Sequence, residues 1–134
     1  MPASPNRRVA LLLGVAYLVL GLVGFAVTAQ VGFAAIEGGM LFGLLSLNPL
    51  HNLVHILLGA ALVMAGSSGV DPSRTTNNAA GTFLLVLGGF GVYAVGTSIN
   101  ILAINAADNA LHFASAAVLL AAGLGTDRPV RAAA

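Results

Sequence analysis

Three histidines and one aspartate occur in two copies of one polar motif, and they are the residues of this chain best suited to chemistry. Both copies read Asn-x-x-(His/Asp)-Asn-x-x-His. The first copy covers residues 48–55, the second covers residues 105–112, and matched residues are 57 positions apart. The copies contain every histidine of the chain, His51, His55 and His112. Residues four apart share one face of a helix, so we expect His51 beside His55 and Asp108 beside His112.

A metal or haem site is the most specific chemistry that these side chains predict. Imidazole and carboxylate groups are ligands of Zn, Fe, Cu and Ni, so His51, His55, Asp108 and His112 are the candidate metal ligands. His55 and His112 alone are candidate axial ligands of a haem held between two helices. The cofactor is left open between a divalent metal and haem. No carboxylate other than Asp108 is available to orient the histidines, which weighs against a metal.

A structural role is the interpretation that the sequence favours. Asn48 and Asn105 stand where they would cap two helices, and Asp108, three residues after Asn105, would complete a capping box. Asn52, Asn109 and the histidines would form hydrogen bonds between helices two and four, at about 0.6 kcal/mol per bond. This interpretation explains the residues near the helix starts well and the histidines deeper in the helices less well.

A proton or ion relay through the same histidines and Asp108 is a third interpretation, because ionisable residues inside membrane segments commonly mark proton or ion pathways. Nucleophilic catalysis has no support, since the chain has no cysteine and no Gly-x-Ser-x-Gly motif. An enzymatic role is therefore less favoured than a non-enzymatic one.

Composition predicts an integral membrane protein. The 134 residues are 58% hydrophobic and 7% charged, with a mean hydropathy of +0.98, whereas a soluble domain carries about 25% charged residues. The formal net charge of +1 comes without a basic stripe, so nucleic acid is excluded as a partner. The lipid bilayer is the expected partner, and a second copy of the chain or a larger membrane complex is left open.

The apolar runs predict an all-α fold with four transmembrane helices in a single domain, residues 1–134. The expected helices cover residues 9–28, 48–66, 79–99 and 105–124, each close to the roughly 20 residues that a span needs. Residues 67–78 are polar and are expected to form a loop. Residues 29–47 are too apolar for an ordinary loop. We expect a re-entrant or interfacial segment that lies against the membrane surface or the bundle and acts as a spacer rather than as a lid.

Arginine positions predict the orientation. All five basic residues are arginines, at positions 7, 8, 74, 128 and 131, and they fall on the two termini and the middle connection. The other two connections have none. The positive-inside rule then predicts a multipass protein of the cell membrane with both termini in the cytoplasm.

The motif repeat predicts that the chain is a duplicated helix pair, with helices two and four at the centre of a pseudo-two-fold four-helix bundle. Their motifs would then face one another, His51 against Asp108, His55 against His112, and residue 52 against residue 109. Between the odd helices the only echo is Leu13-Gly14 with Leu87-Gly88.

The first motif and its surroundings resemble a known family. Residues 42–55, Phe-Gly-Leu-Leu-Ser-Leu-Asn-Pro-Leu-His-Asn-Leu-Val-His, are followed by Leu57-Leu58-Gly59. This string is similar to the signature of domain-of-unknown-function family 4383, a group of small, mostly bacterial membrane proteins with four helices. Residues 108–112, Asp-Asn-x-Leu-His, match its second motif. The resemblance covers nearly the whole chain and implies the fold and the membrane location; it assigns no role to any residue.

Overall fold

Four long helices and one short β-hairpin make up residues 4–127, the part of the chain that the computed structural model describes. The helices are α1 (Pro5–Thr28), α2 (Pro49–Ser68), α3 (Val70–Ala94) and α4 (Ala106–Gly125), and the strands are β1 (Gly39–Leu41) and β2 (Leu45–Leu47). Helices α1, α2 and α4 are long and apolar enough to cross a membrane. The predicted all-α membrane fold is confirmed, and α3 has 25 residues, which is length enough for a fourth span.

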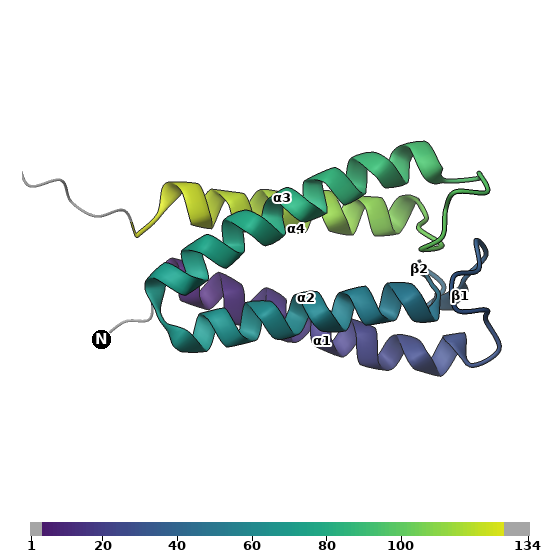
Figure 1. Cartoon of the computed structure of the whole chain (residues 1–134), viewed down its shortest axis with the longest axis horizontal. Coiled ribbons are helices and arrows are strands. Elements are labelled where there is room, and N and C mark those ends of the chain that lie inside the picture. Colours follow the sequence, from purple (N-terminus) through teal and green to yellow (C-terminus); the bar gives the residue numbers. More distant parts are fainter. Residues whose placement is uncertain (1–3, 128–134) are drawn as a thin grey trace, which may run out of the picture.

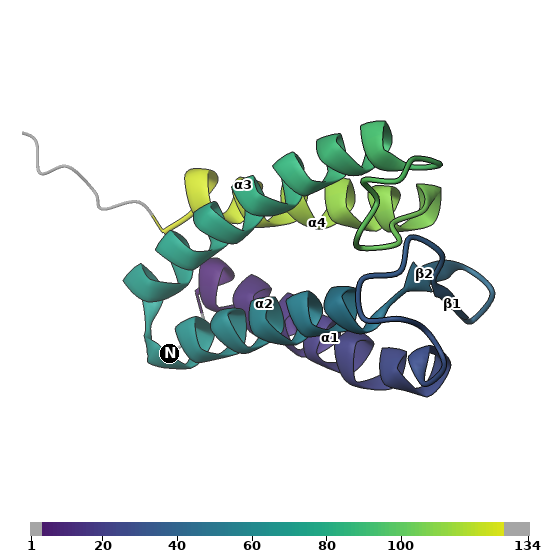
Figure 2. The ribbon, with the colours of Figure 1, turned by 45° about the vertical axis from the view of Figure 1, so that its right-hand side comes forward.

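The helices form two antiparallel pairs. Helix α1 packs along α2 and α3 packs along α4, and both ribbon views show the pairs as separate layers (Figures 1 and 2). The core between the layers is built from α1, α2, α3 and α4 around Tyr17, Leu62, Leu84 and Leu119. The direct contacts between the pairs are mainly α2 with α3 and α1 with α3 and α4. Contrary to the prediction from the sequence, the backbones of α2 and α4 therefore do not pack along one another.

Glycines let the helices of each pair approach closely, and the contacts recur in both pairs. Three α3 glycines each lie 67 positions after an α1 glycine: 81 after 14, 88 after 21 and 91 after 24. The α4 residue that each α3 glycine contacts lies 57 positions after the α2 residue that the matching α1 glycine contacts. The matched contacts are Gly14 with Val63 and Gly81 with Leu120, Gly21 with Ile56 and Gly88 with Phe113, and Gly24 with Asn52 and Gly91 with Asn109. The predicted echo of Leu13-Gly14 with Leu87-Gly88 is wrong by one heptad, because Gly88 occupies the place of Gly21.

The polar stretch at residues 67–78 is helix rather than loop, contrary to the prediction. Gly69, with φ of 141°, turns the chain between α2 and α3 in a single residue, a conformation that side chains rarely allow. The side-chain Nδ2 of Asn77 donates to the Asn6 carbonyl oxygen (3.0 Å) and to Asn6 Oδ1 (2.9 Å). Polar side chains such as Asn77 in this stretch form hydrogen bonds to another helix, so the composition of the stretch resembles that of a loop.

The opposite end of α3 is shorter than predicted, at Ala94 instead of residue 99. Val95 leaves the helix with ψ of 127°. Beyond it Asn100 organises the connection: its amide nitrogen donates to the Ile104 carbonyl oxygen and its Oδ1 accepts from the Ile104 amide, both at 2.9 Å. The side chain thus replaces the backbone bonds that a longer helix would have made.

Residues 39–47 fold back as a hairpin over the ends of α1 and α4. A tight turn at Phe42 and Gly43, with φ of 54° and 66°, joins the strands in register Leu41 with Leu45. The side chains of Leu41, Leu45 and Leu47 are buried against residues of both helices, Leu20, Val27, Ala107 and Leu111. This part of the connection therefore packs on the helix bundle, one of the two positions that the sequence leaves open for it.

A methyl group added at Gly59 tests the close approach of α1 and α2. It would lie 2.5 Å from the Leu18 backbone nitrogen and 2.7 Å from the Gly14 carbonyl oxygen, so the two backbones would have to separate. We expect Gly59→Ala to lower the free energy of unfolding in detergent by about 1–3 kcal/mol. Gly89→Ala is the matched control, since nothing lies within 4 Å of a methyl group there. Equal stability of the two variants would contradict the close packing.

Candidate functional site

The three histidines meet in the interior of the protein, between α2 and α4. The centroids of the His51 and His55 rings are 4.3 Å apart, and the His112 ring lies 5.6 Å from His51 and 6.1 Å from His55. One ring nitrogen from each residue lies within 4.8 Å of the others. All three side chains are at most 1% exposed. Although the backbones of α2 and α4 stay apart, these imidazoles span the distance between them.

The ring nitrogens of this cluster have no hydrogen-bond partners in the described part of the chain. All six are buried and unpaired. The carbonyl groups of Ser46 and Leu102 lie next to the His51 ring but do not meet the geometry of a hydrogen bond. The hairpin and the α3–α4 connection therefore cover the cluster on the His51 side. A buried polar atom without a partner costs about 1–3 kcal/mol, so the arrangement is unfavourable unless something binds it.

Tyr17 of α1 completes the wall of the cluster. Its ring packs against His55 in an edge-on arrangement, with centroids 5.2 Å apart, and it is 1% exposed. Its buried hydroxyl also lacks a hydrogen-bond partner, and Ser115 of α4 lies close to it. The cluster thus draws side chains from α1, α2 and α4.

Asp108 does not join the group of three histidines; it binds backbone amides. Its Oδ2 accepts from the Asn105 amide (2.9 Å), which forms the predicted capping box with Asn105. The same oxygen accepts from the Ser46 amide in β2 (3.1 Å). The side-chain Nδ2 of Asn105 also donates to the Leu44 carbonyl oxygen (2.8 Å). Asp108 and Asn105 therefore tie the hairpin to the start of α4.

The asparagines of the motifs serve the structure in two ways. Asn48 caps α2 by accepting from the His51 amide (2.8 Å), and its nitrogen donates to the carbonyls of Ala35 (2.8 Å) and Ile101 (2.7 Å). It therefore joins the two connections at this end of the molecule. Asn52 donates to the Thr28 hydroxyl (3.0 Å) within its own helix pair.

The predicted opposition of the two motifs holds only for the histidines. Asn52 packs on Gly24 of α1 and Asn109 packs on Gly91 of α3, so the two asparagines point away from one another into their own pairs. Sequence reasoning missed Thr28 and the Ser46 amide. Thr28 could have been found by its place at the end of an apolar span, whereas a backbone amide leaves no signal in the sequence.

Removing the Asp108 carboxylate tests whether it holds the hairpin. We expect Asp108→Ala to speed hydrogen exchange of the Ser46 amide by about 10- to 100-fold, the effect of losing a hydrogen bond to a charged group, about 1.5–3 kcal/mol. Asp71→Ala is the control, because Asp71 is exposed in the first turn of α3. Unchanged protection of Ser46 in the Asp108 variant would show that the hairpin is held by its leucines alone.

Comparison with known proteins agrees with the resemblance seen in the motifs. The model of the family described as Domain of unknown function (DUF4383) matches residues 7–125. No curated protein and no solved structure matches the chain. The match includes all four helices, the hairpin and both motifs, and the chain belongs to this family of unknown function.

Proposed function

We propose that this membrane protein binds a divalent transition-metal ion through His51, His55 and His112. The observation that carries the proposal is the convergence of three fully buried imidazoles whose six nitrogens have no partner within residues 4–127. Neutral imidazole is the commonest protein ligand for such metals. An ion at the centre would supply the missing partner for one nitrogen of each ring.

The geometry suits a site with three protein ligands. Zn–N bonds of about 2.0–2.1 Å in a tetrahedral site place the nitrogens about 3.4 Å apart. The nitrogens here lie within 4.8 Å of one another, so each ring would move inward by less than about 1 Å. Three histidines leave a fourth position for water or another molecule, as in sites where the metal takes part in binding or chemistry. Asp108 is left out of this proposed ligand set because it does not belong to the group whose ligand atoms lie within 4.8 Å of one another. Its Oδ2 binds the Ser46 and Asn105 amides, while its buried Oδ1 has no hydrogen-bond partner among the described residues.

Interhelical hydrogen bonding, the role that the sequence favours, is supported for the asparagines and not for the histidines. Asn48 and Asn52 donate to groups on other segments, whereas the histidine rings donate to none within the described residues. A purely structural cluster at this depth would gain nothing from three imidazoles that lack partners.

Haem is less well supported than a single ion. A haem between His55 and His112 would place a wide planar ring between two imidazoles whose centroids are 6.1 Å apart. The His51 ring lies 4.3 Å from one of them and 5.6 Å from the other. It therefore occupies space that the macrocycle would need.

A proton relay is the second candidate, and the continuous contact of the three rings supports it. Tyr17 extends this series toward Ser115. A relay and a metal site use the same side chains but differ in stoichiometry, because only the metal site holds one ion per chain after purification.

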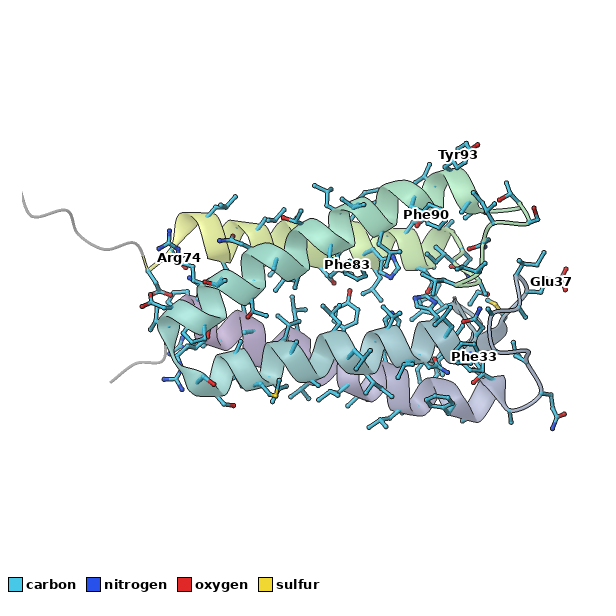
Figure 3. The ribbon with its side chains drawn as sticks, viewed as in Figure 1. Phe33, Glu37, Arg74, Phe83, Phe90 and Tyr93 are labelled. Carbon is cyan, nitrogen blue, oxygen red and sulfur yellow. The ribbon has the colours of Figure 1, made fainter. Side chains whose placement is uncertain are left out.

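We also infer that the chain arose by duplication of a helix pair and that its arginine-bearing end faces the cytoplasm. The recurring glycine contacts support the duplication. So do two matched bonds at that end: Arg7 donates to the Gly66 carbonyl oxygen (2.9 Å) and Arg74 donates to the Gly123 carbonyl oxygen (3.1 Å). Figure 3 shows Arg74 at the end of the molecule opposite Glu37. The positive-inside rule then assigns the hairpin end to the outer face.

Elemental analysis of protein purified without chelators tests the metal site. We expect about one transition-metal ion per chain, and Zn²⁺ added to metal-free protein should raise its thermal stability. His55→Gln and His112→Asn should each lower the affinity for Zn²⁺ by at least about 100-fold, because loss of a ligand exceeds the effect of losing an outer hydrogen-bond partner.

Asn109→Ala is the control for this measurement, since Asn109 lies on α4 one turn before His112 but packs against α3. It should bind Zn²⁺ like the unmodified protein. Metal-free protein whose stability does not change with Zn²⁺, Cu²⁺ or Ni²⁺ would contradict the proposal and leave the relay as the better account.

Cysteine labelling tests the orientation, and the absence of native cysteine makes single substitutions unambiguous. Ser67 and Ser98 are both exposed, at opposite ends of the molecule. In intact cells we expect a membrane-impermeant maleimide to label Ser98→Cys, and to label Ser67→Cys only after permeabilisation. Labelling of both sites from the same side would contradict the topology, and the reverse pattern would contradict the orientation.

A further inference from the structure

An apolar groove opens between α3 and α4, away from the histidines. Its volume is about 440 Å³, enough for part of a small ligand or a lipid chain. The groove lies where α3 ends and α4 begins, near the hairpin end of the molecule. Its lining residues are Val92, Val95, Ala106, Asn109, Ala110 and Phe113.

Asn109 is the polar side chain of this groove, and neither half of its side-chain amide has a hydrogen-bond partner within the described residues. The side chain is 6% exposed. A methyl group at Gly91 would lie 2.0 Å from its Oδ1, so this oxygen lies against α3 at Gly91. Its Nδ2 donates no hydrogen bond within the described residues, while the same residue lines the groove. Of the two amide atoms only Oδ1 is fully enclosed, so the donor that lacks an acceptor is the atom that reaches the surface beside the apolar groove.

The first helix pair shows how this donor lost its acceptor. Asn52 occupies the matching place, and its Nδ2 donates to the Thr28 hydroxyl at 3.0 Å. The position 67 residues after Thr28 is Val95, which has no acceptor. Other lining positions also carry smaller residues in the second pair: Phe25 corresponds to Val92, Pro49 to Ala106 and Leu53 to Ala110. The difference at Thr28 leaves the amide without an acceptor, and the differences at the other three positions make room beside it, although Phe113 is larger than its counterpart Ile56.

We propose that this groove binds one acyl chain of a glycerophospholipid and that Asn109 Nδ2 donates to its ester carbonyl. Helix α4 has 20 residues and is about as long as the hydrocarbon core is thick, so its ends lie where ester groups lie. Asn109 stands one turn inside that end. An ester carbonyl accepts hydrogen bonds without donating any, and the attached chain fits the apolar walls, so one molecule satisfies both features.

Binding of matched lipids to unmodified protein tests the proposal. The probes are a diester phosphatidylglycerol and the diether lipid with the same head group and chains, and native mass spectrometry of protein in detergent measures each complex. We expect the ester lipid to bind about three- to tenfold more tightly, the ratio that corresponds to one hydrogen bond. Asn109→Ala should remove this preference and keep binding of both lipids, because the apolar walls remain.

Ala110→Trp is the second variant, since Ala110 is exposed on α4 and an indole there would fill the groove. It should weaken binding of both lipids, and His112→Asn should leave lipid binding unchanged, which separates this proposal from the metal site. Equal affinity of the unmodified protein for the two lipids would overturn the role of Asn109. Undiminished binding to Ala110→Trp, or a dimer that excludes lipid, would overturn the groove as a lipid site.

Discussion

The need to satisfy polar groups without water governs the interior of this protein. Hydrocarbon offers no hydrogen-bond partners, so a polar side chain on a membrane helix must find one within the protein or in a ligand. Asn6, Asn48, Asn77 and Asn100 do so by binding backbone carbonyls and neighbouring side chains. Against this background the histidine cluster stands out, because all six of its ring nitrogens lack partners among the described residues, whereas Asn52, Asn77 and Asp108 each leave a single oxygen unpaired. A concentration of unpaired groups of this kind points to function.

Close packing of glycines supports that polar interior. A helix that carries glycine at the contact lets its neighbour approach until side-chain amides of one helix rest on the backbone of the other. Asn52 on Gly24 and Asn109 on Gly91 are such contacts. They direct the asparagines into their own pairs, and this leaves the opposite faces of α2 and α4 for the histidines. The position of the proposed metal site is thus a consequence of how each pair packs.

The two helix pairs share a packing plan and differ in what they bind. In the first motif His51 faces the cluster, whereas its counterpart Asp108 holds the hairpin through the Ser46 amide. In the first pair Asn52 donates to the Thr28 hydroxyl, whereas in the second pair Val95 stands at the position that matches Thr28 and lines the groove. The differences at these two positions give the second pair a hairpin attachment on one side and a groove on the other. If the pairs arose by duplication, each copy specialised without changing the glycine contacts.

The sequence by itself determined the membrane class, three of the helix positions and the candidate residues of the site. Apolar runs of about 20 residues and the Asn caps identify α1, α2 and α4. The repeated motif, with its offset of 57 residues, singles out His51, His55, Asp108 and His112. These are local properties, because hydropathy and capping depend on residues within a few turns of one another.

Only the tertiary structure decided which of these residues meet. The start of α3 was hidden because Asn77 bonds to Asn6, 71 positions away, and such a partner makes a polar helix look like a loop. The direction in which the Asn52 side chain points depends on its contact with Gly24. The role of Asp108 depends on its hydrogen bond from the Ser46 amide. Both of these partners are backbone groups, which every residue carries alike. Glycine marks a residue that can lie at a helix contact, but which side chain it meets is decided by packing, and a backbone amide carries no mark in the sequence.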